Sequence, residues 1–240
     1  MRKPWTTWHR PRLRWGLRGQ AVAVLALACA FGAAVHLARR ARDQRELVAA
    51  ISTKGVVLYD WQWRDGRYVQ GPPPWPSWLV RAVGIDALSS PVSVDLSVPR
   101  LKVFAGRTGP SSGDDALMAL IGRLDRLEFL DLTNNPRITD AGLVHLRRLT
   151  RLRRLRIGFL CGVRGPGLVH LRGLNRLESL SLGPGLYTDA DLAPLADLTS
   201  LRELSVRSTR LTDAGLAHLK GLVNLKRPVS LRGSNARNSE

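Results

Sequence analysis

Apolar and polar positions along residues 127–225 follow a pattern that returns every 24 or 25 residues. Each unit opens with apolar residues at alternating positions, the period of a half-buried strand. Its second half places leucines three residues apart, which lays an apolar stripe along one face of a short helix or 3₁₀ turn. The alternating pairs are Leu130/Leu132, Leu155/Ile157, Leu180/Leu182 and Leu204/Val206, and the helical leucines are Leu143/Leu146/Leu149, Leu168/Leu171/Leu174, Leu192/Leu195/Leu198 and Leu216/Leu219/Leu222.

These units begin at Leu127, Leu152, Leu177 and Leu201, and Leu225 opens an incomplete fifth copy. A period of this length headed by LxxLxL is the signature of leucine-rich repeats. One strand and one short helix cannot bury their apolar side alone, so stacked copies must share a continuous core. The sequence therefore predicts an α/β leucine-rich-repeat solenoid, a short horseshoe with parallel strands inside and short helices outside.

The repeat domain is predicted to span residues 92–231. Val92, Val94 and Leu96 alternate like a strand, and leucines at 117, 120 and 124 match the helix of a repeat, which indicates a degenerate first unit. Leu101 offers a second register for that first strand. Val229 and Leu231 can supply a last strand, and residues 232–240 are predicted to form a disordered tail.

Residues 21–38 form an uncharged apolar run of 18 residues, long enough to span a bilayer as a helix. Basic residues flank it on both sides, but those before it are more numerous and are not offset by acidic residues. The positive-inside rule therefore favours a cytoplasmic N-terminal segment over residues 1–20, with the repeats across the membrane. Trp5, Trp8 and Trp15 suit an interfacial belt on that side. A cleaved signal peptide with its site near Ala28–Ala30, a lipid-attached Cys29 and a soluble helix are the alternatives.

Residues 39–91 are expected to connect this membrane helix to the repeats. A charged helix over residues 39–52 is followed by an aromatic alternating stretch and by Asp65-Gly66, a strong hairpin signal. A proline-rich segment then leads into a helix that begins near Pro76. The aromatic and proline residues can form either a ligand groove or the cap that a solenoid end requires, and we favour the cap.

The chain has a net charge of +18. Nearly all of its basic residues are arginines, a bias that can reflect the coding genome as well as a ligand. Its two cysteines, Cys29 and Cys161, lie in the apolar run and in the repeats, so an intramolecular disulfide is not expected and cysteine usage does not fix the compartment. We interpret Cys161 as a small buried apolar residue.

Two segments with the pattern [LI]TDAGLxHLxxLxxL, residues 138–152 and 211–225, resemble the ribonuclease-inhibitor-like leucine-rich repeats abundant in planctomycete bacterial proteins. Similar units occur in the substrate receptors of eukaryotic F-box ubiquitin ligases. The N-terminal VVLYDWQW, PxPSWL and VDL stretches also look like those bacterial proteins, so that the likeness covers about residues 45–225. The sequence departs from the pattern at Arg164-Gly165-Pro166 and at Pro194.

Residues that could carry chemistry have simpler interpretations. His145, His170 and His218 hold equivalent positions, but no Asp or Cys recurs beside them, so we interpret them as helix residues at the solvent edge rather than as a metal ladder. Asp140, Asp189 and Asp213 each follow a Thr and open a helix, where a Thr or Asp accepts backbone N–H bonds. No known catalytic motif or cofactor signature is present, so neither catalysis nor a cofactor is predicted.

Strand side chains that point away from the core form the predicted binding surface, because solenoids bind partners on this concave side. An acidic protein or an anionic polymer is the expected partner, and the face has too few aromatic residues for nucleic acid. The neighbouring basic run at residues 147–156 is either part of this surface or a solvated arginine-rich stretch. The candidate partner-binding residues are Phe129, Asp131, Thr133, Arg154, Arg156, Ser179, Ser181, Glu203, Ser205 and Arg207.

Together these features predict a membrane-anchored leucine-rich-repeat protein that acts as a non-catalytic protein-interaction module. One alternative, by analogy with F-box relatives, is a substrate-recruiting receptor of a larger complex. The other is an unrecognised enzyme.

Overall fold

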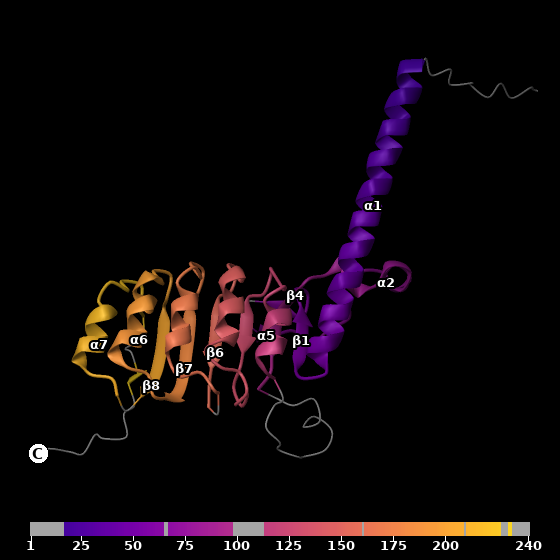
Figure 1. Ribbon diagram of the computed structural model, residues 1–240. Coiled ribbons are helices and arrows are strands. Elements are labelled where there is room, and N and C mark those ends of the chain that lie inside the picture. The colour runs from indigo at the N-terminus through magenta and orange to yellow at the C-terminus, as the bar shows by residue number, and fades with distance from the viewer. Residues whose placement is uncertain are drawn as a thin grey trace, which may run out of the picture.

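The alternating leucines of successive repeats lie side by side in one sheet (Figure 1). In this computed structural model, which describes residues 17–64, 67–97, 113–159, 161–208, 210–226 and 230–231, Leu130 pairs with Leu155, Leu155 with Leu180, and Leu180 with Leu204. Every pair from β4 to β9 is parallel, and β1 adds to β4 in the antiparallel direction. In spatial order the strands are β1 (Val56–Tyr59), β4 (Pro91–Asp95), β5 (Phe129–Asp131), β6 (Arg154–Ile157), β7 (Ser179–Gly185), β8 (Glu203–Ser208) and β9 (Ser230–Leu231).

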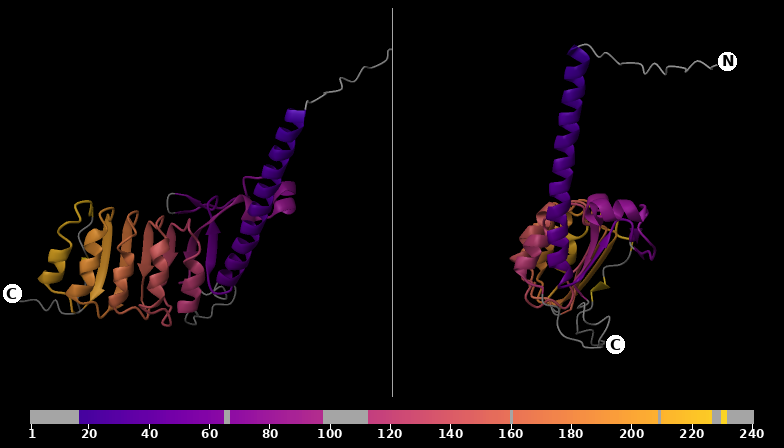
Figure 2. Two further views of the ribbon diagram at one scale, coloured as in Figure 1. Left: turned by 45° about the horizontal axis from the view of Figure 1, so that its top comes forward. Right: turned by 90° about the vertical axis from the view of Figure 1, so that its right-hand side faces the viewer.

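Short helices cover one face of this sheet, as the three-residue spacing of the leucines predicts (Figures 1 and 2). Several are 3₁₀ helices, in which residues three apart lie on the same side. The strand and the helix of each unit run in opposite directions. The turns between them therefore lie along two edges of the sheet, one at the starts of the strands and one at their ends. The helices are α5 (Asp115–Ile121), η1 (Gly142–Arg148), η2 (Pro166–Leu171), α6 (Asp189–Leu192), η3 (Ala193–Asp197) and α7 (Asp213–His218).

Leucines from strands and helices form one continuous core through all the repeats. Leu130, Leu146, Leu155 and Leu171 are each fully buried, and the same holds for most equivalent leucines. The first unit is degenerate, as expected, with Val94 in its strand and Leu117 in its helix both in the core. The alternative register at Leu101 lies outside the described residues, as do Val229 and the predicted tail at 232–240.

A single helix, α1 (Leu17–Ser52), carries both the apolar run and the charged segment after it. The sequence divided these residues into a membrane helix and a separate juxtamembrane helix, but nothing between them breaks the backbone hydrogen bonding. Figures 1 and 2 show the first part of α1 projecting away from the stack and its last part lying against the first repeat. Leu47 and Ile51 belong to the leucine core, so the end of α1 and β1 cover the open end of the solenoid.

A buried carboxylate fastens α1 to this covered end. The Tyr59 hydroxyl donates to Asp86 at 2.6 Å, and Arg45 contacts the other carboxylate oxygen at 3.3 Å. Gln44 donates to the carbonyl oxygens of Asp86 at 3.1 Å and Ser89 at 2.7 Å. Burial and the bond to Asp86 raise the pKa of Tyr59 well above its ordinary value, so the phenol stays protonated and remains a donor. These contacts fix the direction in which α1 leaves the solenoid.

The aromatic and proline-rich segment makes a small unit of its own. Strands β2 (Trp63–Arg64) and β3 (Arg67–Tyr68) pair antiparallel around Asp65-Gly66, as that hairpin signal predicts. Helix α2 (Ser77–Val83) follows Pro76, and α3 (Ile85–Leu88) leads directly into β4. The predicted alternation from Val57 to Trp63 is interrupted after β1 by a turn, which lets Trp63 reach the sheet.

Aspartates at the helix starts join each repeat to the next. We expected a Thr or Asp at this point to cap the helix, and Thr212 does so, because the Ala214 N–H donates to its hydroxyl. The carboxylate of Asp189 instead accepts from the Thr212 N–H at 2.8 Å and from its hydroxyl at 2.6 Å. Asp115 and Thr139 make the same contact three units earlier, between the first two units. Hydrogen bonds to an ionised carboxylate are among the stronger ones, so these contacts fix the spacing of the stack.

The irregular Arg164-Gly165-Pro166 unit preserves its stacking by a compensating change. Gly165 occupies the position at which other units have the aspartate that bonds the next repeat. The threonine of the next unit, Thr188, therefore has no aspartate carboxylate in the preceding unit to bond. Instead Thr188 donates from both its N–H and its hydroxyl to Asp191 in its own unit. Asp191 replaces the glycine found at this position in other repeats, and a side chain at Gly165 would collide with the Asp191 carboxylate at 2.5 Å. The two departures from the repeat pattern therefore depend on each other.

Replacing Leu155 by Ala should lower the free energy of unfolding by about 2–5 kcal/mol, because the side chain is fully buried between repeats. The same change at Leu225, which is half-buried in the last unit, should cost much less. Thermal melts of the full chain in detergent would measure both, since Leu47 and Ile51 are part of the core. Equal losses at the two positions would contradict the repeat register.

Asp189→Asn should destabilise the protein near neutral pH and matter less in acid. Hydrogen bonds from Thr212 lower the pKa of Asp189 below its ordinary 3.8. The carboxylate therefore stabilises the fold above that value, and this stabilisation is lost as the pH falls through the lowered pKa. Denaturant midpoints of wild type and variant measured from neutral to acid pH should converge. The control is Asp213→Asn, the equivalent change in the last described unit. An equal loss of stability there would contradict a stabilising contact between Asp189 and Thr212.

Candidate functional site

The side of the sheet opposite the helices presents equivalent residues in rows. The pairing places Phe129, Arg154, Ser179 and Glu203 in the first row, nearest the starts of the strands. The second row contains Asp131, Arg156, Ser181 and Ser205. Arg207 lies further along β8, level with Pro184, because the register shifts after Leu182. All ten residues that the sequence selected belong to this face or to its continuation, but not all of them are accessible.

Phe129 and Asp131 are buried, contrary to the expectation that they project into solvent. The β2–β3 hairpin brings Trp63 against Phe129, with ring centroids 4.9 Å apart. Arg156 crosses from the next strand, 5.9 Å from the Phe129 ring centroid and 3.6 Å from the Asp131 carboxylate. The hairpin thus covers β5, the first of the four strands that carry these rows. The sequence could not show this, because Trp63 and Phe129 are far apart along the chain.

Beyond that covered strand lies a hollow of about 520 Å³. Seven of the ten predicted residues line it, whereas Phe129, Asp131 and Arg154 do not. Hydroxyl groups form much of its floor, and the basic groups reach it from both sides. The polar lining residues are Thr133, Arg156, Ser179, Ser181, Glu203, Ser205 and Arg207, and the others include Gly158, Phe159, Gly183 and Pro184.

Charge in the hollow is divided among three side chains. Arg156 is 62 % exposed, but its guanidinium is paired with buried Asp131. Glu203 lies within 3.3 Å of the Ser179 hydroxyl, which can donate to it. Arg207 is exposed on the other side of the hollow. The arrangement brings Arg156 and Arg207 to one surface, but it places Arg154 in the first row, outside the hollow.

Phe159 is the accessible aromatic residue of this site, and sequence reasoning missed it. Its side chain is 57 % exposed, although it follows directly after the β6 strand and Gly158. The Asn134 N–H donates to the Phe159 carbonyl at 2.8 Å and holds this loop beside the preceding repeat. The signal was an aromatic residue at a position that Asn134, Pro184 and Ser208 hold in the other units, just beyond the strand pattern that we counted.

The basic run at residues 147–156 does not act as one patch. Arg153 contacts Glu178 at 3.0 Å and Glu128 at 4.0 Å, and Arg154 and Arg156 belong to β6. Arg147 and Arg148 end η1, Arg151 lies in the turn before β6, and all three are exposed. The run therefore divides between the open face and one edge of the solenoid.

The histidines and Cys161 offer no reactive cluster among the described residues. No group of three or more His, Cys, Asp or Glu side chains within those ranges is placed to hold a metal ion. Burial, reinforced by Arg147, lowers the pKa of His170, so that imidazole is neutral. Burial raises the pKa of the Cys161 thiol, which lies 3.7 Å from the Ile138 carbonyl oxygen, so a nucleophilic thiolate is disfavoured there.

Comparisons with known proteins support the assignment of the repeats. Residues 127–146 and 197–219 match the family model described as "Leucine Rich repeat". Among the 29 solved chains that match is an internalin C2 from Listeria monocytogenes, at 17 % identity over 59 % of this chain and 80 % of that one, with a TM-score of 0.32. A search of curated proteins gave no match.

The matched segments contain the strand–turn–helix pattern that the sheet stacks in parallel. The protein therefore carries leucine-rich repeats, and its fold is that of a leucine-rich-repeat solenoid.

Proposed function

We propose that this protein is a membrane-anchored, non-catalytic binding module that holds an acidic segment of a partner protein on the open face of its sheet. The hollow beside Arg156 and Arg207 carries this proposal. It lies on the strand face that solenoids generally use for binding. Its lining of hydroxyl groups, arginines and one exposed aromatic ring offers hydrogen-bond donors and a stacking surface.

An acidic protein segment fits this lining better than a neutral one. Arg207 is exposed, and a guanidinium can bind a carboxylate through two parallel hydrogen bonds. The hydroxyls of Ser181 and Ser205 can donate to backbone carbonyls or to a second carboxylate. Glu203 opposes acid at one end of the hollow and so would favour one direction of the bound segment. An anionic polymer would share the first of these contacts but would not use Phe159.

Helix α1 supports the anchor. By length and composition, one helix among the described residues can cross a membrane: Ala21–Ser52, whose most apolar 18-residue window has a mean hydropathy of 2.2 and is 0 % buried in the protein. A signal sequence would pass the same test. We favour a retained helix because the apolar run continues for nine residues past Cys29, beyond the candidate cleavage site. The larger number of basic residues before it, without acidic ones to offset them, favours a cytoplasmic N-terminus, with the repeats on the far side.

Full-length protein should be recovered in the membrane fraction and should stay there through high-salt and carbonate washes, because these remove proteins held by charge alone. Fractionation followed by N-terminal sequencing would test this. Deleting residues 21–38 is the matched control and should release the protein. Recovery of full-length protein in the soluble fraction, or a mature N-terminus near residues 29–31, would refute the retained anchor.

Arg207→Glu should weaken capture of the partner by roughly threefold or more, since an exposed attraction of up to about 1 kcal/mol becomes a repulsion. It should also flatten the salt dependence of capture. Pulldown from solubilised membranes at several salt concentrations would measure both. Arg207 is the better test residue, because removing Arg156 would also leave the buried Asp131 carboxylate without its ion pair.

Lys220→Glu, in the turn after α7 and away from the open face, is the control for Arg207→Glu, since both side chains are exposed and the charge change is the same. Each variant should melt close to wild type. If the Lys220 variant loses the partner and the Arg207 variant keeps it, the partner binds away from the open face and the open-face proposal fails.

A further inference from the structure

Three arginines occupy one position in successive repeats. Arg126, Arg151 and Arg176 each stand immediately before the leucine that opens a unit, and all three are exposed. This position lies in the turn from helix to strand, so the three residues follow one edge of the sheet, which we name the strand-start edge. Neighbouring parallel strands are about 4.8 Å apart, so the three positions extend over roughly 10 Å.

Among the described residues, the strand-start edge is more basic than the opposite edge. Its five segments from helix end to strand start, residues 122–126, 147–151, 172–176, 196–200 and 220–224, contain eight basic residues against two acidic ones. The described segments of the opposite edge, at residues 113–116, 133–141, 158–166, 185–190 and 208–214, contain three basic and five acidic residues. Within the part of the chain that the structure describes, the two edges therefore differ in charge.

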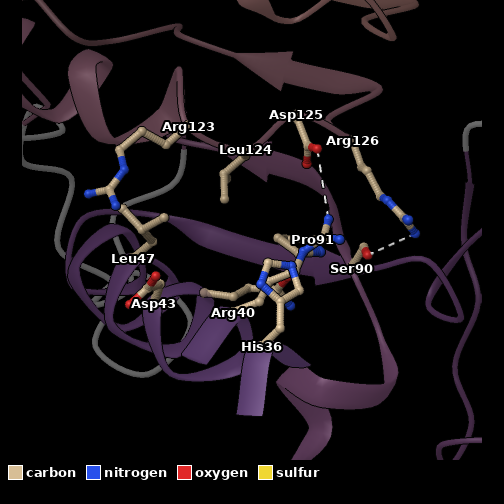
Figure 3. Close-up of a pocket in the computed structure, with 11 residues that line it drawn as sticks. His36, Arg40, Asp43, Leu47, Ser90, Pro91, Arg123, Leu124, Asp125 and Arg126 are labelled. Atoms are coloured by element: carbon tan, nitrogen blue, oxygen red, sulfur yellow. Dashed lines mark hydrogen bonds and ion pairs between the residues drawn. The ribbon is translucent and has the colours of Figure 1, made fainter. Parts of the chain in front are cut away.

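Helix α1 leaves the solenoid at this same edge. A cavity of about 390 Å³ at the junction is lined by His36, Arg40 and Asp43 from α1 and by Arg123, Asp125 and Arg126 from the turn of the first repeat (Figure 3). Arg40 is 3.8 Å from Asp125, and Arg126 donates to the Ser90 hydroxyl at 3.2 Å. The residues of α1 before His36 therefore project beyond the strand-start edge.

The end of the apolar run sets the depth of this junction. The run ends at Ala38, and a helix rises 1.5 Å per residue, so Arg40 is about 3 Å beyond the last apolar residue. The polar headgroup layer begins at that depth when residues 21–38 span the hydrocarbon. Helix α2 lies at the same edge (Figure 1) and exposes Trp78 and Arg81, residue types that suit the interface between lipid and water.

We propose that the strand-start edge lies against the bilayer and binds the headgroups of anionic phospholipids, with the junction cavity and the arginines at 126, 151 and 176 as the contacts. This rests on the membrane anchorage proposed above. Basic residues next to a membrane helix are attracted to anionic lipid, and guanidinium groups bind phosphate oxygens in pairs. The edge would hold the solenoid down on the membrane and leave the open face of the sheet turned sideways, free for a partner.

Energy transfer from the last repeat to the membrane surface would test this. Full-length protein is labelled at Val223→Cys, which is 86 % exposed in the last turn of the strand-start edge, after Cys29→Ala and Cys161→Ala. It is then reconstituted into phosphatidylcholine vesicles, with or without phosphatidylglycerol, that carry a headgroup acceptor. Transfer should rise when phosphatidylglycerol is present and fall back when salt is added, since the Debye length shortens.

The triple variant Arg126→Glu, Arg151→Glu, Arg176→Glu should lose this rise. The matched control is Arg137→Glu, Arg164→Glu, Arg210→Glu, which changes three exposed arginines on the opposite edge and should keep it. Incorporation with the same transfer in both lipids, or an equal loss in both triple variants, would overturn the lipid-binding edge while leaving the anchor intact. Failure of wild type to incorporate even into neutral vesicles would instead overturn the anchor.

Discussion

Burial of leucine between adjacent repeats holds this structure together, because no unit has an apolar core of its own. The strand of each repeat contributes side chains such as Leu155 and Leu180, and its helix contributes others such as Leu171, to one shared interior. Burying one such side chain contributes about 1.5–3 kcal/mol, but only while the neighbouring repeats are in place. Stability is thus a property of the stack, and both ends must be closed.

The N-terminal end of the core is covered by α1, a helix longer than capping the solenoid requires. Leu47 and Ile51 complete the core, and the buried carboxylate of Asp86 joins Arg45 of α1 to Tyr59 of β1 in a partly buried polar network. A loose tether would let the solenoid adopt any direction relative to α1. This network instead fixes that direction, and it is the physical basis for proposing that one particular edge faces the membrane.

Stacking also decides where charge accumulates. Residues that are far apart in sequence but equivalent in the repeat come to lie in rows, so a small bias at one position becomes a line along the molecule. Arginine before the first leucine of a unit makes one edge basic. On the opposite edge, aspartate at the helix start accepts hydrogen bonds from the next repeat, as Asp189 does from Thr212. The open face lies between these edges, with charges of both signs around its hollow.

The repeat pattern alone determined the strands, the helical leucines and their parallel register, because a period of 24 or 25 residues leaves one arrangement that buries every leucine. The sequence also identified the seven polar residues of the hollow, by counting alternate positions along each strand. Only the tertiary structure decided that Trp63 covers Phe129, that α1 is one continuous helix built into the core, and that Asp191 compensates for Gly165. Each of these depends on contacts between segments without a common period, and a periodic pattern carries no information about such contacts.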